Sequence, residues 1–295
     1  MAIKHPEKYY RGVFSDTRNW DRFEHRPGDI FICVPPKSGT TWMQTICGLL
    51  IFGDPDAQIS YTEISPWIEF SLVHELVDQR LEMLSAQTHQ RFIKSHSPLD
   101  GVPYYEDAIY LICHRHPLDV HFSMWNHVQN MKLENNDHLY TDDLSANFEA
   151  FLANGIDGDG FDQPSLALLA HHLNTALAIA DRPNVHLFHY DETSRDLPGQ
   201  MQRIAAAIGV SHTDDLFKKL VVKATFKSMK ETAHLSAPGA GAGLWDDPST
   251  FFQSGKGGKW EGKLDNAQLA NYKAKLAALL SEEEIGYFER GTLPT

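Results

Sequence analysis

The chain has 295 residues, of which 42% are hydrophobic and 11% aromatic, so it can bury a sizeable core as one large domain or two small ones. Its net charge of -13 and its pI near 5.6 argue against non-specific nucleic-acid binding, because neutralising phosphates requires patches of Lys and Arg. Any anion-binding site must therefore concentrate its positive charge locally.

The cysteine pattern and the N-terminus predict the compartment. Cys33, Cys47 and Cys113 fall in apolar segments, which favours buried reduced thiols over a disulfide framework. The N-terminal segment MAIKHPEKYYRGVF lacks the apolar core of a signal peptide, and no apolar run reaches the roughly 18 residues that a membrane span needs. We expect a soluble, cytoplasmic protein that does not enter a membrane.

Predicted strands and helices alternate along the chain. Short apolar runs predict strands at residues 28–34, 91–96, 108–115 and 185–190. Helical patterns follow at residues 42–52, 118–131, 196–209 and 267–280, and Gly209 marks the end of the third. The near-continuous apolar run at 108–115 is typical of a strand that is buried on both faces. This order predicts an α/β fold, a parallel central sheet flanked by helices.

The polar turn PPKSGTT joins the first strand to the first helix. In α/β sheets ligands bind beyond the carboxyl ends of strands, and a helix N-terminus offers unpaired amides to an anion. Gly39 allows close approach of the backbone, Lys37 adds a charge, and hydroxyls come from Ser38, Thr40 and Thr41. From these residues alone a second interpretation stays open, in which a Thr only caps the helix and Lys37 is solvated.

The segment RPGDIFICVPPKSGTTWMQTI resembles the N-terminal signature of sulfotransferases that use 3′-phosphoadenosine 5′-phosphosulfate (PAPS). The resemblance implies a P-loop-like phosphosulfate-binding loop and transfer of a sulfuryl group from PAPS to a hydroxyl or amine of a small molecule, such as a phenol, alcohol or amine. It implies that Lys37 contacts the bridging oxygen and that Trp42 stacks near the adenine. Matching segments run from about Arg26 to Trp260, which suggests one domain over residues 1–295.

The segment FIKSHSPLD resembles the family's base-carrying motif, here Lys94, Ser95 and His96. A neutral imidazole can take the proton of an acceptor hydroxyl, which is otherwise a weak nucleophile. The resemblance implies that His96 is the general base and that Lys94 supports the transferred group. By its position alone, a His such as His96 at a strand end is more often a hydrogen-bonded structural residue.

The segment YLICHRHPLDVHFSMWNH resembles the family's 3′-phosphate motif, which implies that Arg115 and Ser123 bind that phosphate. The planar fork of Arg suits phosphate oxygens. Ser123 is also implied to restrain Lys37 until the acceptor arrives. The alternative is that Arg115 pairs with Asp119 and that Ser123 faces solvent.

Two further segments resemble parts of the family that surround the adenine. HYDETSRDLPGQ implies that Tyr190 approaches the base. ATFKSMK implies that Thr225, Phe226 and Met229 line it, although an aromatic residue near a Met is more often part of a core.

The family's R-K-G-x-x-G-x-W motif corresponds to QSGKGGKW, in which Gly255, Gly258 and Trp260 match. Gln253 and Ser254 replace the Arg and Lys that the family directs at the 3′-phosphate. Lys256 or Lys259 could substitute for them. We expect the Gly-rich segment around 231–262 to form a lid or binding loop. The family's C-terminal dimer motif is not evident, so both a monomer and a homodimer remain open.

The sequence does not predict a metal site, because the neighbouring histidines of HRH and HH lack a completing ligand and DGDGFD lacks the spacing of a calcium loop. Two alternatives to sulfuryl transfer stay open: a nucleotide or nucleoside kinase with a degenerate phosphate loop, and a non-catalytic protein that binds adenosine bisphosphate.

Overall fold

The computed structural model describes residues 5–71, 74–130, 143–156, 161–163, 165–240, 245–253, 255 and 257–291. Within them, strands β1 (Ile30–Cys33), β2 (Phe92–Ser95), β3 (Ile109–His114) and β4 (Val185–His189) form a parallel sheet in the order β2-β1-β3-β4. After β1 the chain adds β2 on one side of it and then crosses over to add β3 on the other side. The loops after β1 and β3 therefore flank a topological switch point. This is where open α/β sheets bind ligands.

Alternate strand residues face opposite sides of the sheet, and both sides are buried. Phe31, Cys33, Ile93 and Ile112 belong to one hydrophobic cluster, whereas their chain neighbours Ile30, Ile32, Phe92 and Leu111 belong to another. Because both faces are covered, each strand is apolar throughout, and this explains the continuous apolar runs in the sequence.

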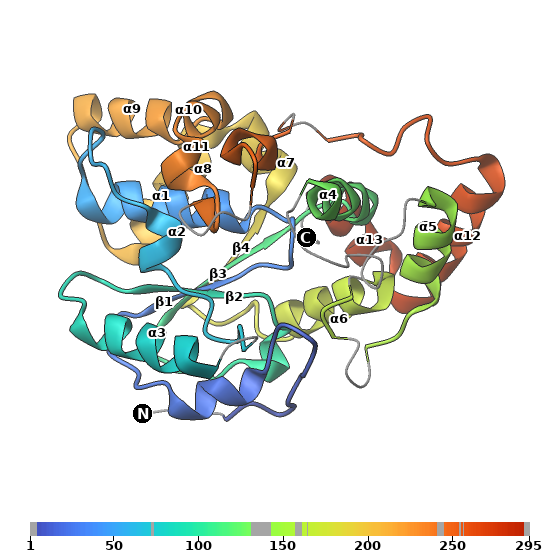
Figure 1. Cartoon of the computed structure of the whole chain (residues 1–295), viewed down its shortest axis with the longest axis horizontal. Helices are drawn as coiled ribbons and strands as arrows, with labels where there is room; N and C mark the ends of the chain where they lie inside the picture. The colour runs from blue at the N-terminus through green and yellow to red at the C-terminus, as the bar shows by residue number, and fades with distance from the viewer. Residues whose placement is uncertain are drawn as a thin grey trace.

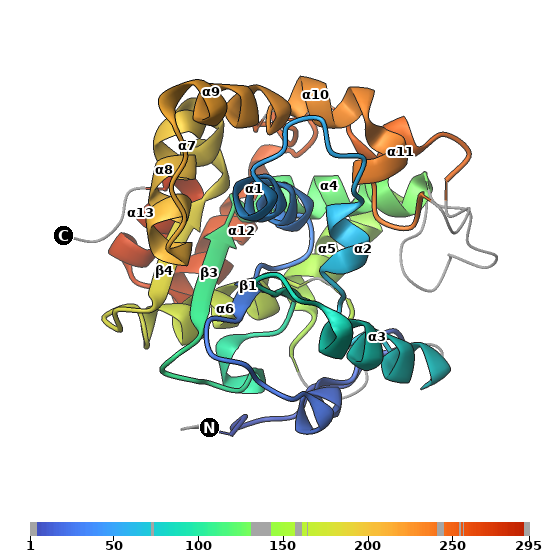
Figure 2. The same cartoon turned by 90° about the vertical axis from the view of Figure 1, so that its left-hand side faces the viewer.

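Helices cover both faces of the sheet (Figures 1 and 2). One cluster includes residues of α1 (Thr40–Phe52), α8 (Leu197–Ile208) and α9 (Asp214–Lys223). The other includes residues of α5 (Leu144–Ala153), α6 (Leu166–Leu177), α12 (Asn266–Leu279) and α13 (Glu282–Arg290). Helix α4 (Pro117–Gln129) begins just after β3. Its residues Ser123, Met124, His127 and Val128 line a cavity together with residues that follow β1, β2 and β3.

The remaining elements are short, apart from α3 (His74–Ala86). They are α2 (Tyr61–Ile64), α7 (Tyr190–Arg195), α10 (Phe226–Glu231), α11 (Ala233–Ser236), and the 3-10 helices η1 (Thr17–Arg22), η2 (Leu99–Gly101) and η6 (Pro248–Phe251). None of the helices in the described part of the chain is both long and apolar enough to span a bilayer.

The predicted strands and helices are confirmed to within a few residues. The first helix begins at Thr40 instead of Trp42, and Gly209 ends α8 in the left-handed conformation, with φ 74°. Between Ser236 and Trp260, η6 is the one regular element among the described residues, as expected of an irregular segment. Of the longer helices, α3, α5, α9 and α13 were not predicted, although α9 and α13 carry a clear helical apolar period. The short helices α2, α7, α10 and α11 were not predicted either.

Candidate active site

The turn between β1 and α1 is shaped to receive an anion. Gly39 is the N-cap of α1 with φ 109°, and no side chain caps the helix, so its first amides stay open to a ligand. The Oγ1 of Thr40 is buried and has no hydrogen-bond partner among the described residues. The interpretation in which Thr40 or Thr41 merely caps the helix is therefore wrong, since both belong to its first turn.

Lys37 has the left-handed φ of 63°, which no other described non-glycine residue shares. Such a conformation is costly for a residue with a Cβ, and its occurrence in an anion-binding turn is typical of functional sites. Its Nζ lies 4.2 Å from the ring centroid of Phe251. Loss of solvent, followed by the charges of Lys259, Arg115 and Lys94, holds the pKa of Lys37 well below its usual value.

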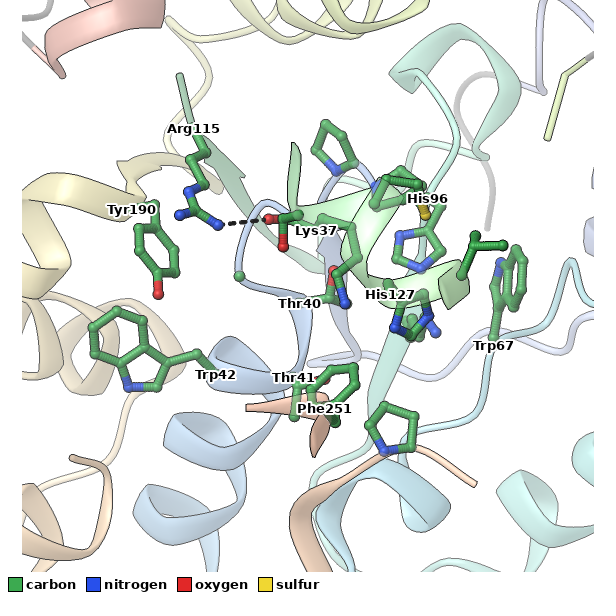
Figure 3. Close-up of a pocket in the computed structure, with 18 of the residues that line it drawn as sticks. Lys37, Thr40, Thr41, Trp42, Trp67, His96, Arg115, His127, Tyr190 and Phe251 are labelled. Atoms are coloured by element: carbon green, nitrogen blue, oxygen red, sulfur yellow. Dashed lines mark hydrogen bonds between the residues drawn. The ribbon is translucent and has the colours of Figure 1, made fainter. Parts of the chain in front are cut away.

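Arg115 follows β3 and lies beside the same turn. Its Nη1 donates a hydrogen bond to the carbonyl oxygen of Lys37 at 3.3 Å, and its guanidinium stacks 4.2 Å from the ring centroid of Tyr190. In Figure 3, Lys37 lies between Arg115 and Tyr190 on one side and His96 and His127 on the other. Positive charge is thus concentrated at the switch point of an acidic chain.

Aromatic side chains form the end of the cavity next to Arg115. Trp42 and Tyr190 meet edge to face, with their centroids 5.3 Å apart, and the Nε1 of Trp42 donates to the carbonyl oxygen of Ala224 at 2.7 Å. Phe226 and Met229 also line the cavity. Thr225 instead caps α10, accepting from the N–H of Ser228 at 3.3 Å, and does not line it.

His96 follows β2 and faces the cavity next to Lys37. Its Nδ1 lies 2.6 Å from the carbonyl oxygen of Val34, so Nδ1 carries the proton and Nε2 is the acceptor nitrogen. Loss of solvent, and next the charge of Lys94, lowers the pKa of His96 well below its usual value. The ring is neutral near pH 7, as a general base must be.

Glu69 holds His96 and its surroundings in place, and sequence reasoning missed it. Its fully buried carboxylate accepts hydrogen bonds from four groups: Trp20 Nε1, Trp67 Nε1, Ser95 Oγ and the backbone N–H of His96. The segment that carries Trp67 and Glu69 is joined to β2 by an isolated bridge between Trp67 and Lys94. No motif marked Glu69, since its donors are distant in the sequence.

Lys94 lies across from this carboxylate. Its Nζ is 4.7 Å from the ring centroid of Trp67. Loss of solvent lowers the pKa of Lys94 to about 8, although the charge of Glu69 acts in the opposite direction. Lys94 therefore presents a poorly solvated ammonium group to the cavity.

The glycine-rich segment is attached to α4 through Asp119, whose carboxylate accepts from the N–H groups of Gly258 at 3.0 Å and Lys259 at 2.9 Å. Trp260 stacks on His116, with centroids 5.4 Å apart. These contacts bring Lys259 to the cavity, where loss of solvent and then the charge of Arg115 lower its pKa to about 8.

Gly255 lies where this segment passes close to Phe226. Its φ is 64°, and a Cβ at this position would lie 2.6 Å from the Phe226 ring, so only glycine fits. The hydroxyl of Tyr190 donates to the carbonyl oxygen of Gly255 at 3.3 Å.

One cavity of about 390 Å³ joins these parts. Most of the predicted site residues line it: Lys37, Gly39, Thr40, Thr41, Trp42, Lys94, His96, Arg115, Ser123, Tyr190, Phe226, Met229 and Gly255. Ser38 is buried in the turn and does not line the cavity, and Lys256 lies outside the described residues.

The far half of the cavity has a mainly apolar wall. It includes Phe14, Trp67, Phe70, Phe161, Leu168, Leu169 and Phe251, with His127, Asp162 and His172 as polar members. These residues come from segments spread over the whole chain. No cluster of three or more metal-binding side chains occurs in the part of the chain that the structure describes.

The sulfotransferase domain family model matches residues 27–282. A glycolipid sulfotransferase of Mycobacterium tuberculosis is 29% identical over 99% of this chain and 98% of its own length. Sulfotransferase 2A1 of Macaca fascicularis is 25% identical over 84% of this chain and 82% of its own.

Solved structures show the same fold. Mouse sulfotransferase SULT7A1, crystallised with PAP, superposes with a TM-score of 0.70 at 22% identity over 91% of this chain and 89% of that one. Retinol dehydratase, crystallised with androsterone and the inactive cofactor PAP, gives 0.71 at 20% identity over 94% of this chain and 88% of that one. The chain therefore belongs to the sulfotransferase domain family and is an enzyme of the class that transfers a sulfuryl group from PAPS.

Proposed function

We propose that this enzyme sulfates a hydroxyl of a small molecule with an apolar body, with His96 as the general base and Lys37 assisting the leaving group. The single observation that carries this proposal is the placement of a neutral imidazole and a lysine on one cavity, beside an open helix N-terminus. When bound, PAPS supplies the sulfuryl group and leaves as adenosine 3′,5′-bisphosphate.

The donor end of the cavity fits such a group. The uncapped amides of α1 and the unpartnered Oγ1 of Thr40 are donors without an acceptor among the described residues, and Lys37 adds a cation beside them. These groups would neutralise the charge that develops on the leaving phosphate oxygen. Trp42, Tyr190 and Phe226 would enclose the adenine.

The 3′-phosphate would be held by Arg115, Ser123 and Lys259. All three line the same part of the cavity, and Lys259 supplies a cation where the family's Arg and Lys are replaced by Gln253 and Ser254. The 231–262 segment, through Phe251 and Gly255, would cover the bound donor as a lid.

His96 would take the acceptor proton at Nε2 while the acceptor oxygen attacks sulfur in line with the leaving oxygen. Lys94, next to His96, would support the transferred group. The apolar far wall favours an alcohol with a lipid-like or ring body, and the mycobacterial relative is named for a glycolipid acceptor. Family membership favours sulfuryl transfer over the kinase alternative.

Transfer from labelled PAPS to a panel of alcohols, phenols and amines tests the proposal. His96→Asn should lower kcat by roughly 10²- to 10⁴-fold with donor affinity retained. Lys37→Met should lower kcat for acceptors of every class. The matched control His234→Asn changes an exposed histidine and should leave turnover unchanged. Full turnover by His96→Asn would reject the base assignment, and absence of transfer by the unmodified protein would favour the non-catalytic alternative.

A further inference from the structure

His127, which the proposed transfer does not use, lines the far half of the cavity, where we place the acceptor. It lies on α4 four residues after Ser123, about one helical turn, so both side chains project from the same face. The rings of Trp245 and Phe251 pack against it, with centroids 5.1 and 5.6 Å away. The Nζ of Lys37 also lies over the ring of Phe251, so the same ring places His127 near Lys37 (Figure 3).

His127 is a polar residue in aromatic surroundings. Its Nδ1 is buried and makes no hydrogen bond within the described ranges. A buried polar atom without a partner is unfavourable, and a Phe would fill the same space without that cost. The arrangement is understandable if a bound molecule supplies the missing partner.

The charge state of His127 suits a hydroxyl. Loss of solvent, followed by the charges of Lys37, Lys94 and His96, holds its pKa well below the usual value. A neutral imidazole has one donor and one acceptor nitrogen, so it can hydrogen-bond to a hydroxyl in either sense.

Neutral imidazoles from different elements therefore face one volume: His96 and His127, with His172 of α6 as a third on its wall. His96 follows β2 and His127 lies on α4, and the charge of His96 is among those that lower the pKa of His127. An acceptor with a single hydroxyl would use His96 and leave His127 without a partner, whereas an acceptor with two neighbouring hydroxyls would satisfy both.

We propose that His127 binds a second hydroxyl of the acceptor, adjacent to the one that is sulfated, so that the preferred acceptors are vicinal diols attached to an apolar body. This inference rests on the proposed function and specifies its substrate class. His127 forms and breaks no covalent bond: the proton of the sulfated hydroxyl goes to His96, and the second hydroxyl stays hydrogen-bonded to His127.

The test compares three acceptors with the same carbon chain: octan-1-ol, octane-1,2-diol and octane-1,8-diol. We measure kcat/KM with labelled PAPS, and acceptor binding to the protein loaded with adenosine 3′,5′-bisphosphate by calorimetry. The 1,2-diol should be preferred over both others by about tenfold, since a site built for a hydroxyl discriminates against its absence. The 1,8-diol controls for polarity without adjacency.

His127→Phe should abolish the preference, so that the 1,2-diol reacts no faster than octan-1-ol does with the same variant. His127→Gln, which retains hydrogen-bonding groups, should keep part of the preference. His234→Phe is the matched control, because it makes the same change at an exposed histidine. Thermal melting verifies that each variant is folded.

Equal losses with all three acceptors in His127→Phe, or an unchanged diol preference, would overturn the inference. Transfer to alcohols without a diol preference would also overturn it while the proposed function stands. If the unmodified protein transfers sulfate to no acceptor, the proposed function fails, and the binding comparison still decides whether His127 recognises a vicinal diol.

Discussion

At the scale of the residue, the site depends on buried groups whose charge is set by their surroundings. His96 is neutral because it is desolvated and lies beside Lys94, and the carbonyl of Val34 determines which of its nitrogens is the acceptor. Glu69 is a buried carboxylate held by donors from three segments, and it links the Trp67 wall to the backbone of His96. Burial that would be a cost to stability is here what prepares the chemistry.

Lys94 should show this cost directly. Its pKa is lowered from 10.5 to about 8, so below pH 8 the folded protein carries a charge whose burial costs about 3 kcal/mol. Lys94→Met removes that cost and also the contact with Trp67, worth about 0.5–1 kcal/mol. We expect the variant to be more stable by about 2 kcal/mol at pH 7 and to have lost most of its sulfate transfer.

The difference in unfolding free energy between Lys94→Met and the unmodified protein should depend on pH. Between pH 8 and 10.5 the unfolded chain binds the Lys94 proton and the folded chain does not, so the unmodified protein gains stability as pH rises. The advantage of Lys94→Met, measured by urea unfolding, should therefore shrink over this range. Lys273→Met, at an exposed site on α12, serves as the control. An advantage that stays constant with pH would contradict the assignment.

At the scale of the element, helix α1 shows how a strand–turn–helix unit leaves a helix N-terminus open to an anion. Most of its residues are buried, and its apolar side chains pack against the sheet. This packing stabilises the helix although no side chain caps it. The N-terminal amides stay open as a result. The left-handed conformations of Lys37 and Gly39 set the path of the turn that leads into this N-terminus, where we propose that the donor's phosphosulfate binds.

Gly39→Ala tests this geometry. The backbone at this position has φ 109°, and the new Cβ would lie 3.1 Å from the Tyr190 ring. We expect a loss of about 1–2 kcal/mol in unfolding free energy and a clear loss of affinity for adenosine 3′,5′-bisphosphate. Urea unfolding and calorimetry measure the two effects.

Gly155→Ala is the matched control, because a Cβ there meets no atom within 4 Å and its φ is ordinary. It should change stability by less than about 0.5 kcal/mol. A Gly39→Ala protein with unaltered donor affinity would show that this turn does not hold the phosphosulfate end.

At the scale of the whole molecule, the cavity joins distant parts of the chain. The turn after β1, the ends of β2 and β3, helix α4 and the 245–260 segment all contribute to it. Asp119 connects the last of these to α4 through Gly258 and Lys259. A bound nucleotide would therefore stabilise the assembly of the sheet with this late segment.

This arrangement predicts how ligands shift thermal stability. A ligand at 100 times its Kd stabilises the folded state by about 2.7 kcal/mol, and at the same concentration a tighter ligand stabilises it more. Adenosine 3′,5′-bisphosphate should therefore raise Tm more than adenosine 5′-phosphate at equal concentration. Lys259→Met should weaken the bisphosphate roughly tenfold or more and leave the monophosphate unchanged, because only the 3′-phosphate meets Lys259. Lys273→Met should change neither. Equal weakening of both ligands would reject this role for Lys259.

Much of the molecule could be predicted from local patterns. The strand and helix positions follow from apolar periodicity, and the resemblance of the motifs led to Lys37, His96, Arg115 and Tyr190, which all line the cavity. Two residues named on the same grounds lie elsewhere: Thr225 caps α10 and Ser38 is buried within the turn. A motif identifies a segment, but the direction of each side chain depends on the packing around it.

The sequence by itself determined the α/β fold, the polar turn between the first strand and the first helix, and the family, because these depend on residues close together in the chain. Tertiary structure alone decided that Glu69 meets His96, that Asp119 positions Lys259, and that His127 shares a cavity with His96. Each of these pairs is far apart in the sequence. Their contact depends on the order in which the parallel strands assemble and on the helices that pack over their ends, and no local propensity encodes that order.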